Sequence, residues 1–90
     1  MTDDSDDRRR RRLLYRSTHR GTREADLILG GFVRAHLADL SSGEFACLER
    51  LLEESDPDLM AWIGRGVPPL EYDIDLFKLI VKFKNHQSRH

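Results

Sequence analysis

The most chemically distinctive segment of this 90-residue sequence is Arg20-Gly21-Thr22-Arg23-Glu24. It places two guanidinium groups and one carboxylate around a glycine, so a tight turn here would present charges of both signs. Guanidinium groups pair with carboxylates through two parallel hydrogen bonds, and a glycine lets another backbone approach closely. The segment is therefore a candidate surface for binding a charged partner.

A purely structural interpretation explains most of the same residues. Gly21 suits the left-handed position that follows a helix, and Thr22 suits the N-cap of the next helix. Glu24 would lie in the first turn of that helix, where the helix dipole favours an anion. Arg23 is not explained in this way, because a cation in a first turn is unfavourable. The residues alone leave the two interpretations open.

Residue types suited to catalysis or metal binding are sparse. Cys47 lies between Phe45 and Leu48 in an apolar stretch, where a thiol is typical of packing rather than nucleophilic attack. His86 and His90 have the spacing of one helical face, but two ligands near a chain end make a weak metal site. We therefore predict no catalytic residues, no metal site and no enzymatic activity.

Arginines are concentrated near the N-terminus, where Arg8 to Arg12 directly follow an aspartate-rich segment. Such a run could line phosphates along a helix, which is the main argument for a nucleic-acid-binding protein. The neighbouring aspartates cancel much of this charge at short range, and the net charge of the chain is −1. We predict no nucleic-acid partner; an arginine-rich nucleic-acid-binding helical protein and a generic protein–protein adaptor are the alternatives.

Length and composition predict one small domain. Residues 1–12 are expected to form a charged, flexible N-terminal segment, residues 13–84 a helical domain and residues 85–90 a frayed tail. The single cysteine indicates a reducing compartment, and no apolar stretch approaches the roughly 20 residues that span a bilayer. The acidic start lacks the apolar core of a signal peptide. We expect a cytoplasmic protein that has no membrane partner and is monomeric when free.

Apolar residues recur at helical spacing along the chain, which predicts an all-α fold, a compact five-helix bundle with short loops. The first helix is expected to begin at Ser5 or Asp6 and to run to about Thr18. Gly21 would then form its C-terminal turn. The residues expected to face inward are Leu13, Leu14 and Tyr15.

The second helix, from about Thr22 to Leu40, has the clearest periodicity. The pair Gly30-Gly31 in its middle should cost about 1 kcal/mol for each glycine relative to alanine, which indicates close approach by another helix or a bend. The pair follows no strand, so it does not indicate dinucleotide binding. The residues expected on the buried face are Ala25, Ile28, Leu29, Phe32, Val33, His36, Leu37 and Leu40.

Three further helices have recognisable start signals. Ser41 to Glu44 has the form of a capping box, which predicts a third helix that ends near Ser55. Asp56 is expected to cap a fourth helix, with Pro57 at its first position, and Asp73 to cap a fifth. The expected core residues of these helices are Phe45, Leu48, Leu51, Leu52, Leu59, Trp62, Ile63, Leu76, Phe77, Leu79, Ile80 and Phe83.

Two blocks of this sequence, taken together, resemble a known family. The first is Arg-Gly-x-x-Glu, here Arg20 to Glu24, and the second is Leu-Leu-Glu, Asp-x-Asp-Leu and then Trp-Leu, here within Leu51 to Ile63. The loop with Gly66 and Pro68 matches a third element, Gly-x-Pro. Over about residues 14–83 the chain is thus similar to the SdhE family of bacteria, which is related to the mitochondrial succinate dehydrogenase assembly factor 2. The charged N-terminus, the C-terminal tail and the glycine pair are not family features.

The resemblance implies an assembly factor that binds the flavoprotein subunit of succinate dehydrogenase, or of the related fumarate reductase, and promotes covalent attachment of FAD. It implies no cofactor of the chain's own, because FAD is bound by the partner flavoprotein. The Arg-Gly-x-x-Glu surface would dock onto that partner. The partner-binding residues are then Arg20, Gly21, Arg23 and Glu24, with Tyr15 and His19 as rim contacts about one helical turn earlier.

Overall fold

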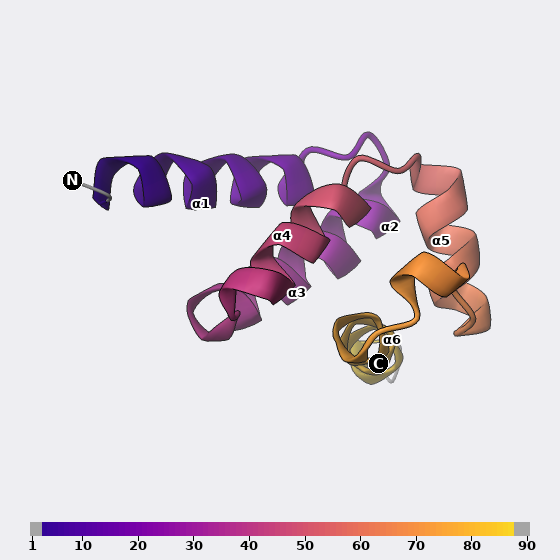
Figure 1. The fold of residues 1–90 in the computed structure, drawn as a ribbon. Coiled ribbons are helices and arrows are strands. Elements are labelled where there is room, and N and C mark those ends of the chain that lie inside the picture. The colour runs from indigo at the N-terminus through magenta and orange to yellow at the C-terminus, as the bar shows by residue number, and fades with distance from the viewer. Residues whose placement is uncertain (1–2, 88–90) are drawn as a thin grey trace.

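Helices joined by short loops make up nearly all of the chain (Figure 1). The structure is a computed structural model that describes the backbone of residues 3–87 and the side chains of residues 6–86. Within that range there is no strand, and the predicted all-α class is confirmed. The elements are α1 (Asp3–Thr18), α2 (Arg23–Ala25), a π-helical segment (Asp26–Gly30), α3 (Gly31–His36), a 3₁₀ turn (Leu37–Asp39), α4 (Ser42–Leu51), α5 (Asp56–Arg65), a second 3₁₀ turn (Leu70–Tyr72) and α6 (Asp75–Gln87).

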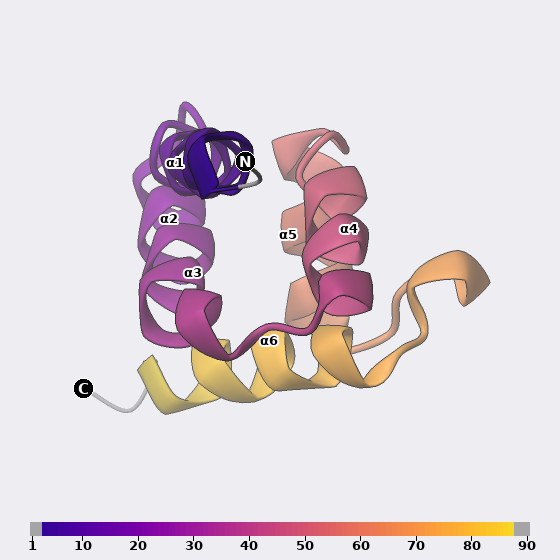
Figure 2. The ribbon, with the colours of Figure 1, turned by 60° about the vertical axis from the view of Figure 1, so that its left-hand side comes forward.

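The arrangement corresponds to the five predicted helices, because α2, the π-helical segment and α3 form one continuous helix. This composite helix occupies the centre: α1 packs on its π-helical segment and on α3, and α6 packs on the π-helical segment and on α5. Figure 2 shows α1 across the start of the composite helix and α6 crossing beneath α3 and α5. In this range no helix combines the length and apolar character needed to cross a membrane.

The core lies where these helices meet and contains most of the residues expected there. His36, Leu37, Leu40, Cys47, Trp62 and Phe83 are only partly buried. The prediction of an inward position is wrong for two residues. Tyr15 is 62% exposed and Leu79 is 40% exposed, because their helix faces point away from the core. The buried hydrophobic residues are Leu13, Ala25, Ile28, Leu29, Phe32, Val33, Phe45, Leu48, Leu51, Leu52, Leu59, Ile63, Tyr72, Leu76, Phe77 and Ile80.

Gly30 and Gly31 allow two other helices to approach the composite helix closely, as predicted. A Cβ atom on Gly30 would lie 2.8 Å from Cγ2 of Thr18 and 3.3 Å from the carbonyl oxygen of Ser17, both in α1. A Cβ atom on Gly31 would lie 3.0 Å from the ring of Phe83 in α6. The two glycines therefore let α1 and α6 pack against adjacent sides of one helix. The local widening into a π-helix ends at Gly30, so the irregularity coincides with this contact.

The predicted start of the third helix has the expected chemistry, and a glycine ends the fourth. Ser41 and Glu44 form the capping box: the Ser41 hydroxyl accepts from the Glu44 N–H at 3.1 Å, and the Glu44 carboxylate accepts from the Ser41 N–H at 2.9 Å. Gly66 ends α5 in the left-handed conformation, with φ of +72°. Its N–H donates to the carbonyl of Trp62 at 2.8 Å, which satisfies one of the free carbonyls at the end of that helix.

The caps predicted for the last two helices are wrong by one residue. Ser55 caps α5, because its hydroxyl accepts a hydrogen bond from the Asp58 N–H at 3.3 Å. Asp56 is instead the first residue of the helix, and its carboxylate is bound by an arginine described below. The carbonyl of Ile74 accepts the first hydrogen bonds of α6, so Asp73 lies one position before the cap.

The predicted flexibility of residues 1–12 stays a prediction. In the structure, residues 3–12 form the first part of α1, and residues 6–12 are exposed, whereas Leu13 is buried. The last helix includes residues 85–87, and the remainder of the predicted frayed tail, like His90 of the proposed metal pair, lies outside the described residues.

The close approach at Gly30 predicts a stability difference between two glycine-to-alanine substitutions. Gly30→Ala should lower the free energy of unfolding by about 1–3 kcal/mol, because the new methyl group meets α1. Gly64→Ala is the matched control: Gly64 is helical and exposed, a Cβ atom there meets nothing within 4 Å, and the change should stabilise by about 0.5–1 kcal/mol. Urea unfolding of both variants measures this, and equal effects would contradict the packing described here.

Candidate partner-binding site

The segment that connects α1 to α2 is a tight, exposed turn. Gly21 has φ of +101°, a conformation that disfavours any other residue, and Thr22 is the N-cap of α2. The Thr22 hydroxyl accepts from the N–H of Ala25 at 3.2 Å. The structural interpretation of these two residues is therefore confirmed. Local interactions thus set the backbone conformation of the turn, independently of any partner.

The side chain of Arg20 points into the protein and is only 10% exposed. Its Nε donates to Oδ1 of Asp56 at 2.8 Å, and its Nη1 donates to the carbonyl of Leu52 at 2.5 Å. Its Nη2 donates to the carbonyl of Glu54 at 2.9 Å. The planar guanidinium thus fastens the turn to the connection between α4 and α5, and it satisfies two carbonyls after the end of α4 that would otherwise lack partners.

The backbone of Arg20 is held as well. Its N–H donates to Oδ1 of Asp26 at 2.6 Å, so the turn is closed on its other side by the first residue of the π-helical segment. Arg20 therefore pairs with a carboxylate of its own chain, Asp56, and its guanidinium is not left open for a partner. Among the residues assigned to partner binding, Arg20 has the geometry of a residue that positions the others.

Gly21, Arg23 and Glu24 lie on the surface. Among the described residues, neither the Arg23 guanidinium nor the Glu24 carboxylate has a hydrogen-bond or ion-pair partner. The two side chains come from consecutive residues in the first turn of α2, next to a glycine that adds no bulk. Together they present one cation and one anion on a rigid backbone, an arrangement that can accept hydrogen bonds and pair with a carboxylate at the same time.

Tyr15 and His19 form a flat aromatic surface beside the turn. Their rings stack with centroids 3.9 Å apart and planes inclined by 14°. His19 is held further by contacts of its Nδ1 with the carbonyl of Tyr15 at 2.9 Å and with the Thr18 hydroxyl at 3.0 Å. Both residues are exposed, so the position predicted for them next to the motif is compatible with contact to a partner.

Sequence reasoning missed two contributors to this region. Asp56 was interpreted as a helix cap, although its occurrence in the second sequence block, together with Arg20 in the first, was a possible signal of their pairing. Leu27 was not singled out; it is 62% exposed and follows Glu24 by three residues, so it adds an apolar group beside the charged turn. Its position within an apolar run gave no sign of exposure.

A buried tyrosine supports the α4–α5 connection from the other side. The hydroxyl of Tyr72 donates to Oε2 of Glu54 at 2.8 Å, and the residue is 4% exposed. Burial, and then the hydrogen bond to the Glu54 carboxylate, raise the pKa of Tyr72 to about 12 from its ordinary value of 10.0. Glu54 is thus held twice, through its carbonyl by Arg20 and through its side chain by Tyr72.

The described part of the chain offers no cluster of three or more histidine, cysteine or acidic residues that could hold a metal ion. What the geometry provides instead is an exposed charged turn on a small helical protein, braced from behind by an internal arginine. Such a surface is suited to contact with another protein.

Comparison with known proteins identifies the family. The profile of the Sdh5 family, described as flavinator of succinate dehydrogenase, matches residues 11–85. The chain therefore belongs to this family, and the resemblance found in the sequence is confirmed. The match includes both sequence blocks and all residues from Tyr15 to Glu24 that form the candidate site.

Individual relatives agree with this assignment. The chain is 43% identical over 60 residues to the FAD assembly factor SdhE of Acetobacter pasteurianus, covering 67% of this chain and 55% of the relative. It is 37% identical over 84 residues to the mitochondrial succinate dehydrogenase assembly factor 2 of Drosophila virilis, covering 90% of this chain and 53% of the relative. For the protein of the same name from Dictyostelium discoideum, the identity is 35% over 72 residues. The chain spans about half the length of these relatives.

The contacts of Arg20 predict a large and coupled loss of stability on their removal. Arg20→Met keeps the methylene groups but leaves Asp56 and two carbonyls without their donor, and it should cost about 3 kcal/mol. In a double-mutant cycle with Asp56→Ala, the coupling energy should exceed about 1 kcal/mol. Arg16→Met is the control, because Arg16 is 45% exposed and lies 4.0 Å from Glu53, a geometry worth less than about 0.5 kcal/mol. Equal losses for Arg20→Met and Arg16→Met in urea unfolding would contradict the assignment.

Tyr72 predicts a specific loss of stability at alkaline pH. Because its pKa is raised on folding, the neutral phenol contributes stability that is complete below pH 10 and is lost as the pH rises through about 12. Wild type should therefore lose up to about 2–3 kcal/mol more than Tyr72→Phe between pH 9 and pH 12. Unfolding free energies measured across this range test the effect, and parallel curves for the two proteins would rule it out.

Proposed function

We propose that this chain is an assembly factor that binds the flavoprotein subunit of succinate dehydrogenase, or of the related fumarate reductase, and promotes covalent attachment of FAD to that subunit. Membership of the flavinator family supports this function, as do the names of the bacterial and mitochondrial relatives. The observation that carries the proposal is the pair Arg23 and Glu24, which is exposed and has no partner within the described chain.

The factor acts by contact, and the chemistry of flavin attachment belongs to the flavoprotein. A protein that binds one conformation of its partner more tightly than others raises the population of that conformation by this difference in affinity. If that conformation is the one in which flavin and acceptor residue meet, attachment is accelerated without an acid, base or nucleophile from the factor. The factor needs no FAD of its own, because the flavin is held by the partner.

Each exposed residue of the turn has a definite role in this proposal. Arg23 pairs with a carboxylate of the partner, and Glu24 accepts hydrogen bonds from its donors. Gly21 adds no side chain, so the partner backbone can approach the turn closely. Tyr15 and His19 form an aromatic rim at one side of this contact. The factor binds as a monomer, in the cytoplasm of its cell.

Rigidity of the turn is the second part of the proposal. Binding costs free energy for every flexible segment that becomes ordered in the complex. Here the order is already present, because Arg20 ties the turn to the α4–α5 connection and Thr22 caps α2. Arg20 is thus a positioning residue in this proposal, and its effect on the partner passes through Arg23 and Glu24.

The proposal predicts that Glu24→Ala strongly reduces covalent flavin on the partner. In cells that lack the native gene, wild type should restore fluorescence of the flavoprotein band in a denaturing gel, and Glu24→Ala should restore it at least about tenfold less well, which corresponds to about 1.4 kcal/mol of binding free energy. Glu71→Ala is the matched control, because Glu71 is an exposed acid outside the turn.

Circular dichroism establishes that both variants are folded. The proposed function fails if deletion of the gene leaves flavin attachment unchanged. The proposed role of the turn fails if Glu24→Ala and Glu71→Ala restore attachment equally.

A further inference from the structure

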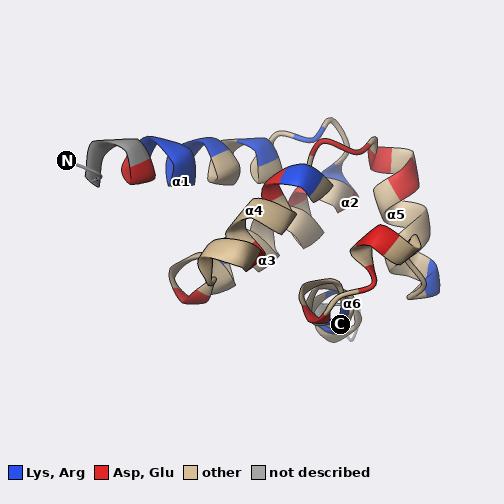
Figure 3. Cartoon of the chain, viewed as in Figure 1, with Lys and Arg blue, Asp and Glu red and all other residues tan. Residues whose placement is uncertain are grey.

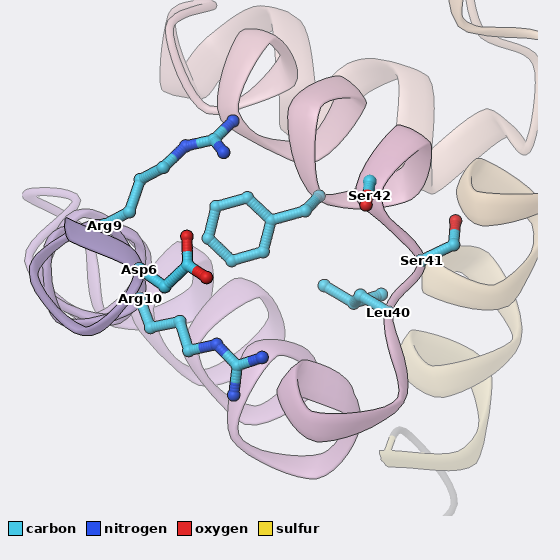
Figure 4. A pocket seen from close by; sticks show the side chains of 7 residues that line it. Asp6, Arg9, Arg10, Leu40, Ser41 and Ser42 are labelled. Atoms are coloured by element: carbon cyan, nitrogen blue, oxygen red, sulfur yellow. The ribbon is translucent and has the colours of Figure 1, made fainter. Parts of the chain in front are cut away.

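The arginine-rich part of α1 contains one residue that is used within the fold. Arg9 donates to the carboxylate of Glu49 in α4 through Nη2 at 2.6 Å and Nε at 3.1 Å, and its guanidinium lies 4.9 Å from the centre of the Phe45 ring. The hydrogen bond and the charge of Glu49 raise the pKa of Arg9 above its ordinary value. Figure 4 shows Arg9 and Arg10 reaching from α1 beside a cavity of about 120 Å³, which Asp6 and Phe45 also line.

Arg8 and Arg12 are different, because both are exposed and neither has a hydrogen-bond or ion-pair partner within the described residues. Together with Arg9 and Glu49 they line an open space of about 380 Å³ beside α1. Arg11 has only a long contact of 3.9 Å with Asp7, in which both side chains are about 70% exposed. Arg8 and Arg12 therefore leave two guanidinium groups available on the surface.

These two arginines lie on the same face of the helix as the aromatic pair. Arg8, Arg12, Tyr15 and His19 are separated by four, three and four residues, the spacing of one helical stripe. The stack of Tyr15 on His19 continues this stripe beyond the end of α1, and the buried Leu13 and Ser17 lie on other faces. We call these four residues the outer stripe. It leads along α1 directly to the turn that presents Arg23 and Glu24.

The stripe has an energetic cost that the described part of the chain does not offset. Arg8 and Arg12 repel each other at i,i+4 spacing, and neither lies in the last turn of α1, where the helix dipole would favour a cation. Arg9 docks the helix, whereas Arg8 and Arg12 add no contact to the fold. Contact with a partner would explain why two unpaired arginines occur beside the charged turn.

We propose that the outer stripe is a second docking surface, continuous with the charged turn, for an acidic surface of the flavoprotein subunit. This inference rests on the proposed function. Figure 3 shows the charge asymmetry that supports it: arginines follow α1 and the turn into α2, and acidic residues gather at the α4–α5 connection, the start of α5 and the second 3₁₀ turn.

An acidic partner surface is therefore attracted to one side of the protein and repelled from the other. Arg8 and Arg12 would pair with its carboxylates, and the Tyr15–His19 stack would cover the surface between those carboxylates and the turn. Such a contact at the edge of an interface mainly raises the rate of association and makes that rate dependent on salt.

The test compares two charge-reversal variants with the same change in net charge. Arg8→Glu/Arg12→Glu alters the outer stripe, and Lys78→Glu/Lys82→Glu alters two exposed lysines of α6 at the same spacing. The association rate with the purified flavoprotein subunit is measured by stopped-flow fluorescence at low and high salt. The stripe variant should associate at least about tenfold more slowly at low salt and lose most of the salt dependence. The α6 variant should remain close to wild type.

Arg8→Gln/Arg12→Gln removes the two positive charges without adding negative charge next to Asp6 and Asp7. It should show a smaller loss in the same direction, and it guards against misfolding of the reversed variant. Equal rates for the stripe and α6 variants would overturn the inference. If Glu24→Ala abolished the complex while the stripe variant matched the α6 variant, the proposed function would stand and only the second surface would fail. If wild type did not bind the flavoprotein at all, both the proposed function and the second docking surface would fail.

Binding to a short RNA duplex is a separate measurement. If the stripe variant lost this binding while its association with the flavoprotein stayed unchanged, the inference of a second docking surface would also be overturned.

Discussion

The guanidinium group of Arg20 joins parts of the chain that are far apart in sequence. It bonds to Asp56, 36 residues away, and to the carbonyls of Leu52 and Glu54. These contacts hold the α1–α2 turn against the α4–α5 connection, which is where the two charged sequence blocks meet. Each of the three guanidinium nitrogens makes a hydrogen bond, which explains how the Arg20 side chain can be 10% exposed without a buried nitrogen that lacks a partner.

The same contact separates the charged motif into one internal residue, Arg20, and two exposed residues, Arg23 and Glu24. Because Arg20 is used inside the protein, Arg23 and Glu24 are the charged groups of the motif that remain exposed for the proposed partner contact. The turn that precedes them takes its conformation from the left-handed Gly21 and from the Thr22 cap, so little order would have to be gained in the proposed complex. The glycine pair adds a second constraint: it lets α1 lie directly on the composite helix, which sets the direction in which α1 enters the turn.

Local sequence signals predicted the helices well, because capping boxes, left-handed glycines and apolar periodicity act over a few residues. The capping box at Ser41 and Glu44, the end of α5 at Gly66 and the close packing at Gly30 were all predictable in this way. The pairing of Arg20 with Asp56 was not, because nothing local indicates which of several exposed-looking charges turns inward. For the same reason Asp56 was mistaken for a cap that Ser55 provides, and Tyr15 was expected in the core although its face of α1 meets no other helix.

The contact of Arg20 with Asp56, a residue 36 positions further along the chain, keeps the charged turn rigid. Amide hydrogen exchange of the free protein measures this directly when wild type is compared with Asp56→Ala, a change outside the turn. Faster exchange of the amides from Arg20 to Asp26, with protection in the middle of α6 unchanged, is the predicted result. Unchanged protection of the turn in Asp56→Ala would contradict the account, because the turn would then be held by its local bonds alone.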